Sequence, residues 1–154
     1  MSLKPAEVGQ EDESAWPLAP DPDQPPPGKY IVAYRWARLI AKRFGNRDTI
    51  ELHFKVVEPP RWKERMLIMY CGIPLDGRPS RNSKYVMMWT LANGGSAKRR
   101  DRMTPRVFAG YWAATVVHTG RKMTKDGSKE LGAGEMGTAV ISSLIEREAG
   151  GVQR

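Results

Sequence analysis

The sequence has very few of the side chains on which redox and metal chemistry depend. It contains one cysteine, Cys71, and two histidines, His53 and His118. A single thiol cannot form an intramolecular disulfide, which is typical of proteins from reducing compartments. The three residues also lack the spacing of metal ligands. We therefore expect no metal site, no cofactor and a cytoplasmic location.

Long apolar runs and catalytic motifs are also missing. No apolar run reaches the roughly 18 residues of a membrane span, and the N-terminus has no apolar signal-peptide core. The phosphate-loop, GxSxG, HExxH and GxGxxG patterns are absent. In residues 29–147, the carboxylates are isolated from one another among lysines and arginines. We expect no enzymatic activity, no catalytic residue and no membrane partner.

Charge is abundant but unevenly placed. The net charge is +8, yet residues 1–28 have six acidic side chains against one lysine, and seven of the twelve prolines. Such a composition buries too little apolar surface to fold. It predicts a disordered acidic tail over 1–28, a folded body over 29–147 and a frayed end over 148–154. The tail could be inert, compete with an anionic ligand, or recruit a protein partner. The basic excess favours a polyanionic partner.

Two strand patterns open the body. Residues 30–41 are rich in β-branched and aromatic side chains. Residues 49–57 alternate, with apolar side chains at the even-numbered positions from Ile50 to Val56. The segment between them, 44–48 (FGNRD), consists of turn residues. Together these patterns predict an antiparallel hairpin with one buried and one polar face.

The rest of the body predicts one helix and three strands. Residues 66–72 are apolar almost throughout, which predicts a central strand. Ser83 caps a short helix that ends at Gly94. Two further strands are predicted over 111–118 and 136–145. Three strands, a helix and two strands predict an all-β fold with one short helix, a five-stranded OB-fold-like barrel. A small α+β sandwich is the alternative.

Basic side chains and flat rings alternate through this body. Proteins hold single-stranded nucleic acid with cations that follow the phosphates and rings on which bases stack. In an OB-fold the ligand crosses the second and third strands, between the loops that join strands one to two and four to five. Both loops are basic here. The predicted nucleic-acid-binding residues are Tyr34, Trp36, Arg38, Lys42, Arg43, Arg47, His53, Lys55, Arg61, Trp62, Lys63, Lys98, Arg99, Arg100, Arg121, Lys122 and Lys125.

The orientation of the rings is only partly determined by their spacing. Tyr34, Trp36 and Arg38 are two residues apart and are expected on one strand face, although the period does not decide whether that face is inner or outer. Trp62 follows two prolines in a charged loop and is expected to be exposed. Trp89 lies on the apolar face of the predicted helix and is expected in the core.

Four segments together resemble a known group of proteins. They are GKYIVAY, IELHFKVV, SKYVMMWTLANGG and KRRDRMTPRVFAGYWAATV, within residues 28–146. They resemble OB-fold proteins of plasmids, integrative elements and phages that are similar to single-stranded DNA-binding proteins. The resemblance implies DNA binding during replication or transfer of a mobile element, without catalysis. Bacterial housekeeping proteins of this kind have their acidic tail at the C-terminus, so recruitment by this N-terminal tail does not follow.

The sequence therefore predicts a sequence-tolerant binder of single-stranded DNA. Stacking and phosphate contacts serve RNA equally well, and self-association through edge strands stays open. The alternative is a protein–protein adaptor or inhibitor subunit of a mobile element that binds no nucleic acid. The acidic tail beside a basic body motivates that alternative.

Overall fold

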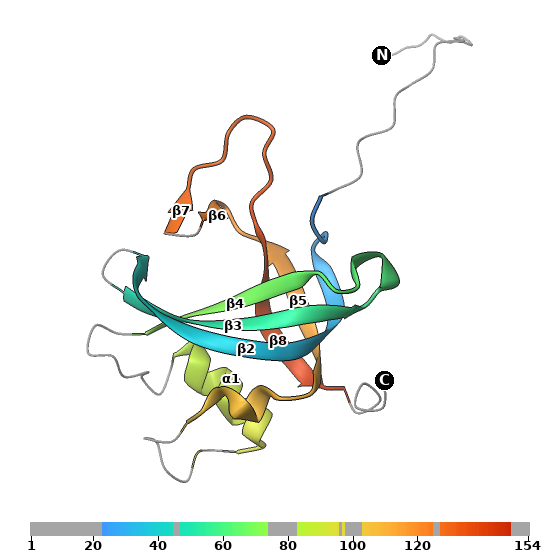
Figure 1. Ribbon diagram of the computed structural model, residues 1–154, viewed down its shortest axis with the longest axis vertical. Coiled ribbons are helices and arrows are strands. Elements are labelled where there is room, and N and C mark those ends of the chain that lie inside the picture. Colours follow the sequence, from blue (N-terminus) through green and yellow to red (C-terminus); the bar gives the residue numbers. More distant parts are fainter. Residues whose placement is uncertain are drawn as a thin grey trace.

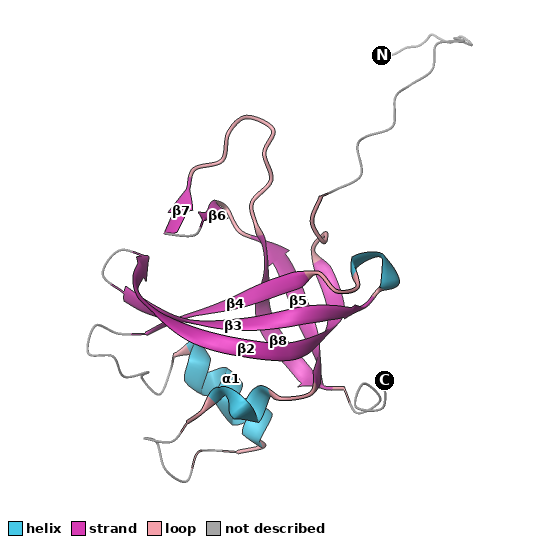
Figure 2. Cartoon of the chain, viewed as in Figure 1, coloured by secondary structure: helices cyan, strands magenta, loops and turns pink. Residues whose placement is uncertain are grey.

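The chain folds as a curled antiparallel β-sheet with one helix against it (Figure 1). The computed structural model describes residues 23–44, 47–73, 83–95, 97, 103–124 and 127–148, except for the side chains at 42–44, 47 and 73. The five strands of the sheet are β2 (Gly28–Phe44), β3 (Arg47–Glu58), β4 (Met66–Ile73), β5 (Tyr111–His118) and β8 (Ala139–Arg147). Figure 2 shows that strands dominate the fold.

The predicted mostly-β class and the strand–helix–strand sequence are confirmed, but the order within the sheet differs from the order along the chain. The hydrogen-bonded order is β4-β3-β2-β5-β8, so the first strand lies at the centre. The edges β4 and β8 lie against each other without pairing into a closed barrel. The prediction that 66–72 is a central strand is wrong. Its apolar composition fits an edge strand that packs one face into the core and faces β8.

Helix α1 (Lys84–Asn93) has the ends that the sequence predicts. The Ser83 hydroxyl accepts a hydrogen bond from the Val86 amide at 3.3 Å, and Gly94 adopts a φ of 75°. Trp89 is buried, and its indole N–H donates to the Thr104 carbonyl at 2.9 Å. Thr104 precedes a short 3-10 helix, η3 (Pro105–Phe108), that packs against α1. The predicted core position of Trp89 is confirmed.

The core lies on the inner face of the curled sheet. Leu52, Phe54 and Val56 of β3 are fully buried there, as the alternation predicts, but Glu51 and His53 on the predicted polar face are buried as well. Trp112 of β5 meets the apolar side chains from the other side, and its indole N–H donates to the Phe108 carbonyl at 2.8 Å. In Figure 1, β2, β3 and β4 cross in front of β5 and β8, so the core lies between these two groups of strands.

The last residues of the predicted tail are packed against the body. The Gln24 side chain accepts a hydrogen bond from the Ala139 amide at 2.7 Å and donates to the Gly137 carbonyl at 2.5 Å. Arg65 donates to the Asp23 carbonyl at 2.6 Å. Residues 1–22 and 149–154 lie outside the described part of the chain. The segment from Asp23 to β2 is therefore held on the sheet by its own hydrogen bonds.

The basic loop before the last strand contains a small hairpin that the sequence analysis missed. Strands β6 (Lys122–Thr124) and β7 (Gly127–Lys129) form a separate two-stranded sheet. Gly137 follows it at a close backbone contact, since an added Cβ would lie 1.5 Å from the Thr119 carbonyl oxygen. Only glycine fits there. The hairpin stands above the sheet in Figure 1.

Candidate nucleic-acid interface

A β-bulge in β2 turns Tyr34 and Trp36 to opposite faces of the sheet. Tyr34 pairs with Phe54 and Trp36 pairs with His53, so Arg35 is an extra residue between the two pairs. Phe54 and His53 are neighbours on a regular strand and therefore point in opposite directions. The prediction that Tyr34 and Trp36 share one face is wrong, because simple alternation cannot count the extra residue.

Tyr34 belongs to the inner face. Its ring makes an edge-to-face contact with Phe54, with centroids 5.7 Å apart, and a tilted contact with Phe108 at 6.2 Å. Burial raises the pKa of its phenol above the ordinary value. This partly buried ring packs against the core from the inner face and does not belong to the outer face.

The opposite side of β2, β3 and β4 carries a mixed set of polar, charged and aromatic side chains. We call it the outer face. Neighbouring strands bring its members into cross-strand rows. The outer face comprises Trp36, Arg38 and Ile40 of β2, Thr49, Glu51, His53 and Lys55 of β3, and Met66, Ile68 and Tyr70 of β4.

Trp36 lies flat on this face. Its ring stacks on the imidazole of His53, with centroids 3.6 Å apart and planes at 13°. The two residues are unequally exposed, His53 at 7 % and Trp36 at 45 %. Because the imidazole covers one side of the indole from below, the exposed area is the other side. The sheet therefore presents a flat aromatic surface to solvent, which is the geometry that base stacking requires.

A buried carboxylate holds this stack in place. Glu51 is 1 % exposed, and its Oε1 atom accepts hydrogen bonds from Arg38 Nε at 3.0 Å and from His53 Nε2 at 3.1 Å. A buried carboxylate requires such a charged partner. Burial is the largest cause that lowers the pKa of His53, and Arg38 acts in the same direction, whereas Glu51 opposes it. Because a carboxylate only accepts hydrogen bonds, the contact requires a proton on Nε2 of His53.

Sequence reasoning missed six members of the outer face, among them Glu51, Tyr70 and Thr49. Tyr70 is half-buried and lies opposite Glu51, on the same face as Trp36. The signal was the alternation of side chains along β4. Met69 and Cys71 flank Tyr70 and are fully buried, so Tyr70 points away from the core. Thr49 is also buried here, and among the described residues its hydroxyl has no hydrogen-bond partner. Its burial was not expected because it alternates with apolar residues.

Trp62 is not a second platform. It is 9 % exposed and packs in the core cluster, so the prediction of an exposed ring is wrong. The loop folds back onto β3 through hydrogen bonds from the Glu64 amide to the Val56 carbonyl at 2.9 Å and from the Val56 amide to the Arg65 carbonyl at 2.8 Å. Arg61 covers the indole from outside, with its guanidinium carbon 5.0 Å from the ring centroid.

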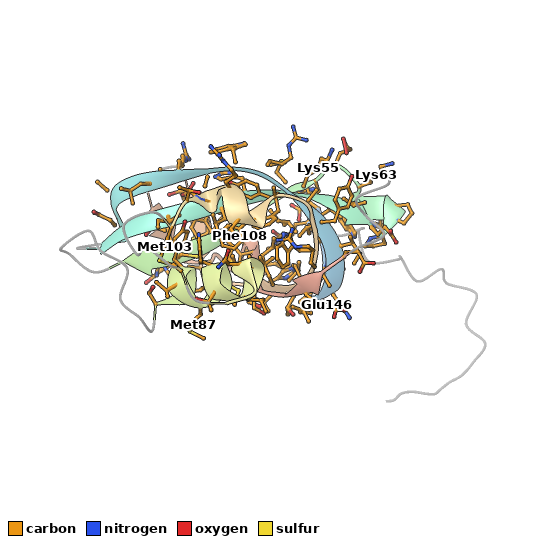
Figure 3. The ribbon with its side chains drawn as sticks, turned by 90° about the horizontal axis from the view of Figure 1, so that it is seen from below. Lys55, Lys63, Met87, Met103, Phe108 and Glu146 are labelled. Carbon is orange, nitrogen blue, oxygen red and sulfur yellow. The ribbon has the colours of Figure 1, made fainter. Side chains whose placement is uncertain are left out.

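Two of the predicted basic residues, Lys55 and Lys63, lie in β3 and in the loop that follows it. Lys55 pairs with Glu64 at 3.1 Å, and Lys63 in the adjoining loop is exposed. In Figure 3, Lys55 and Lys63 project from the side of the molecule opposite to Met87 of α1. These lysines therefore lie on the side away from the helix.

A polar cleft of about 290 Å³ lies where the N-terminal segment meets the β6–β7 region. Arg65 and Lys122 line it, together with Gln24 and Glu135. Lys122 pairs with Glu135 at 3.6 Å, and this ion pair lowers the pKa of the Glu135 carboxyl after the larger effect of the Gly132 amide. Arg65 directly precedes Met66 and points to the opposite side of the sheet, where its guanidinium carbon lies 5.8 Å from the centroid of the buried Trp62.

The other predicted basic residues are not brought to one place by the described structure. Arg121 is exposed and donates from Nε to the Ser128 hydroxyl at 2.8 Å. The remaining predictions lie outside the described side chains, at Lys42, Arg43, Arg47, Lys98, Arg99, Arg100 and Lys125.

The described residues offer little for other chemistries. They contain no cluster of three or more histidine, cysteine, aspartate or glutamate side chains that could hold a metal ion. Burial raises the pKa of the Cys71 thiol to about 11, which makes it a poor nucleophile. In the same part of the chain, the helices are too short and too polar to span a bilayer.

Comparison with known proteins found no match for this chain. No protein-family model matches it, and neither a curated protein nor a solved structure matches it.

Proposed function

We propose that this protein binds single-stranded DNA, largely without regard to sequence, through the outer face of β2, β3 and β4. In this proposal the curled sheet is an OB-fold-like barrel, open between β4 and β8. The protein serves replication or transfer of a mobile genetic element in the cytoplasm and catalyses no reaction. The single observation that carries the proposal is the indole of Trp36, exposed on one side and supported on the other by His53.

The supported indole favours stacking over a purely structural role. A tryptophan that only closes a core would be covered by its neighbours, whereas Trp36 is 45 % exposed. Its position is maintained by His53 and Glu51, so little side-chain entropy is lost when a base stacks on it. A base on such a platform contributes about 1–3 kcal/mol.

Cations near this platform support a path for the phosphates. Arg38 lies beside Trp36, with its guanidinium carbon 5.6 Å from the indole centroid. Lys55 follows on the outer face, next but one to His53 on β3. A strand that stacks on Trp36 would have both cations within the same face.

The salt dependence of binding tests the proposal. The full chain would be titrated into a labelled oligo-dT of about 15 nucleotides, a length that spans the usual site size of one such domain. If about four to six phosphates are neutralised, the logarithm of the affinity falls with the logarithm of salt concentration with a slope of about −3 to −4. Absence of binding at low salt would reject the proposal.

A protein–protein adaptor remains the alternative, and one observation favours it. Met87 and Leu91 lie four residues apart on α1 and are 57 % and 43 % exposed. Residues at that spacing share one side of a helix. A partner bound there would associate in a salt-insensitive manner and be lost in Leu91→Glu, while no oligonucleotide would bind.

A further inference from the structure

We infer that Arg38 gives the proposed site a preference for guanine at the base that stacks on Trp36. The inference rests on the proposed function and deepens it. Contacts to the phosphates stay independent of sequence, and Arg38 recognises a base edge at one position of the bound strand. The observation behind it is that a buried carboxylate aims the guanidinium beside the exposed indole.

The orientation of Arg38 is constrained from inside the sheet. Its Nε atom donates to Glu51 Oε1 at 3.0 Å, and Glu51 is 1 % exposed. Since a guanidinium is planar, this bond restricts the direction in which both Nη atoms point. No described residue accepts a hydrogen bond from either Nη atom, and the side chain is 50 % exposed. Several N–H donors are thus left for a ligand.

Arg38 is close to the ring of Trp36. The guanidinium carbon is 5.6 Å from the indole centroid. A base in van der Waals contact with the indole would lie about 3.5–4 Å above it. In this inference the Nη atoms donate hydrogen bonds to the edge of that base. The stacked base and the arginine therefore act on the same nucleotide.

The chemistry of the bases favours guanine over thymine and adenine. Guanine presents two adjacent acceptors, N7 and O6, which match the fork of an arginine and form its commonest specific contact. Adenine replaces O6 with an amino group, which repels a donor. Thymine has no adjacent pair of acceptors, and cytosine has one only on its Watson–Crick edge, at N3 and O2. A phosphate would also accept from Arg38, but it would give no difference between bases.

The experiment compares three oligonucleotides of equal length. One is all thymine, one has a single central guanine, and one has 7-deazaguanine at that position, which retains O6 and the ring but lacks N7. With the wild-type full chain we expect about tenfold tighter binding of the guanine oligonucleotide than of oligo-dT, and loss of most of that gain with 7-deazaguanine. Equal affinity for the guanine and 7-deazaguanine strands would overturn the inference.

Arg38→Lys provides the matched variant, because it retains the charge beside Glu51 and removes the fork. Its affinities for the guanine and 7-deazaguanine strands should be equal, whatever its affinity for oligo-dT. Arg61→Lys, beside the buried Trp62, is the control and should retain the preference. If oligo-dT binds without any guanine preference, only this inference fails. If no oligonucleotide binds, the proposed function fails as well.

Discussion

Trp36 and Trp62 have similar chemical neighbours and opposite environments. Each has arginine beside it, with guanidinium carbons 5.6 Å from the Trp36 centroid and 5.0 Å from that of Trp62. Yet Trp36 is 45 % exposed and Trp62 is 9 % exposed. An arginine next to a tryptophan therefore says little about whether the ring is available to a ligand.

The backbone around each ring explains the difference. Near Trp36, a bulge at Arg35 shifts the register and turns the indole onto the outer face, above His53. Near Trp62, the loop returns to Val56 through backbone hydrogen bonds and carries the indole into the core. We therefore expect the two tryptophans to differ in experiments, with Trp62 determining stability and Trp36 determining binding.

The largest expected effect is on stability. Trp62→Ala should lower the free energy of unfolding by about 3–5 kcal/mol, because it leaves a cavity in the core. Trp36→Ala should lower it by about 1 kcal/mol, since much of that ring is in solvent. Urea unfolding of both variants measures the difference. A loss for Trp36→Ala as large as that for Trp62→Ala would show that the indole is structural.

Binding should reverse this ranking. Trp36→Ala should weaken oligo-dT binding by about 1–3 kcal/mol, because a stacking surface is removed. Trp62→Phe retains an aromatic ring in the core and serves as the matched control, with unchanged affinity. Anisotropy titrations at one salt concentration measure both. If Trp62→Phe weakens binding and Trp36→Ala does not, the assignment of the two rings is reversed.

The pH dependence of stability sharpens the comparison, because only Trp36 rests on a titratable ring. The pKa of His53 in the folded protein is below its ordinary value of 6.5. Below about pH 6.5 the unfolded chain therefore binds a proton that the folded chain resists, and stability falls as the pH decreases. Urea unfolding between about pH 7.5 and 5.5 measures this fall. His53→Gln should remove its own share of the slope, and an unchanged slope would contradict the assignment.

The smallest expected effect is at Thr49, the buried residue of the outer face whose hydroxyl has no partner among the described residues. Thr49→Val conserves the shape and removes the unsatisfied group. It should leave binding unchanged and raise the free energy of unfolding by up to about 1 kcal/mol. Destabilisation by a similar amount would mean that the hydroxyl does have a partner.

Local signals predicted the elements well, and long-range contacts account for the rest. The Ser83 cap, the Gly94 end and the strand Tyr111–His118 follow from short patterns that act within a few residues. The position of β2 at the centre of the sheet depends on its pairing with β5, far along the chain. No local pattern encodes such a pairing, so the strand order was not predictable.

The candidate site was predictable as a set of residue types and not as a surface. The alternation of aromatic and basic side chains indicated a site on β2 and β3, and Trp36, Arg38 and His53 do lie together. Alternation placed Tyr34 with them, because a bulge leaves no sign in a period of two. Composition likewise placed Trp62 in solvent, although backbone hydrogen bonds of its loop decide otherwise.

The indole N–H signals in an NMR spectrum, recorded during titration with oligo-dT, test the central claim most directly. Substitution of single tryptophans assigns each signal. The account predicts that the Trp36 signal shifts strongly on binding, while the signals of the buried Trp62, Trp89 and Trp112 stay in place. A stationary Trp36 signal in a sample that binds the oligonucleotide would contradict it.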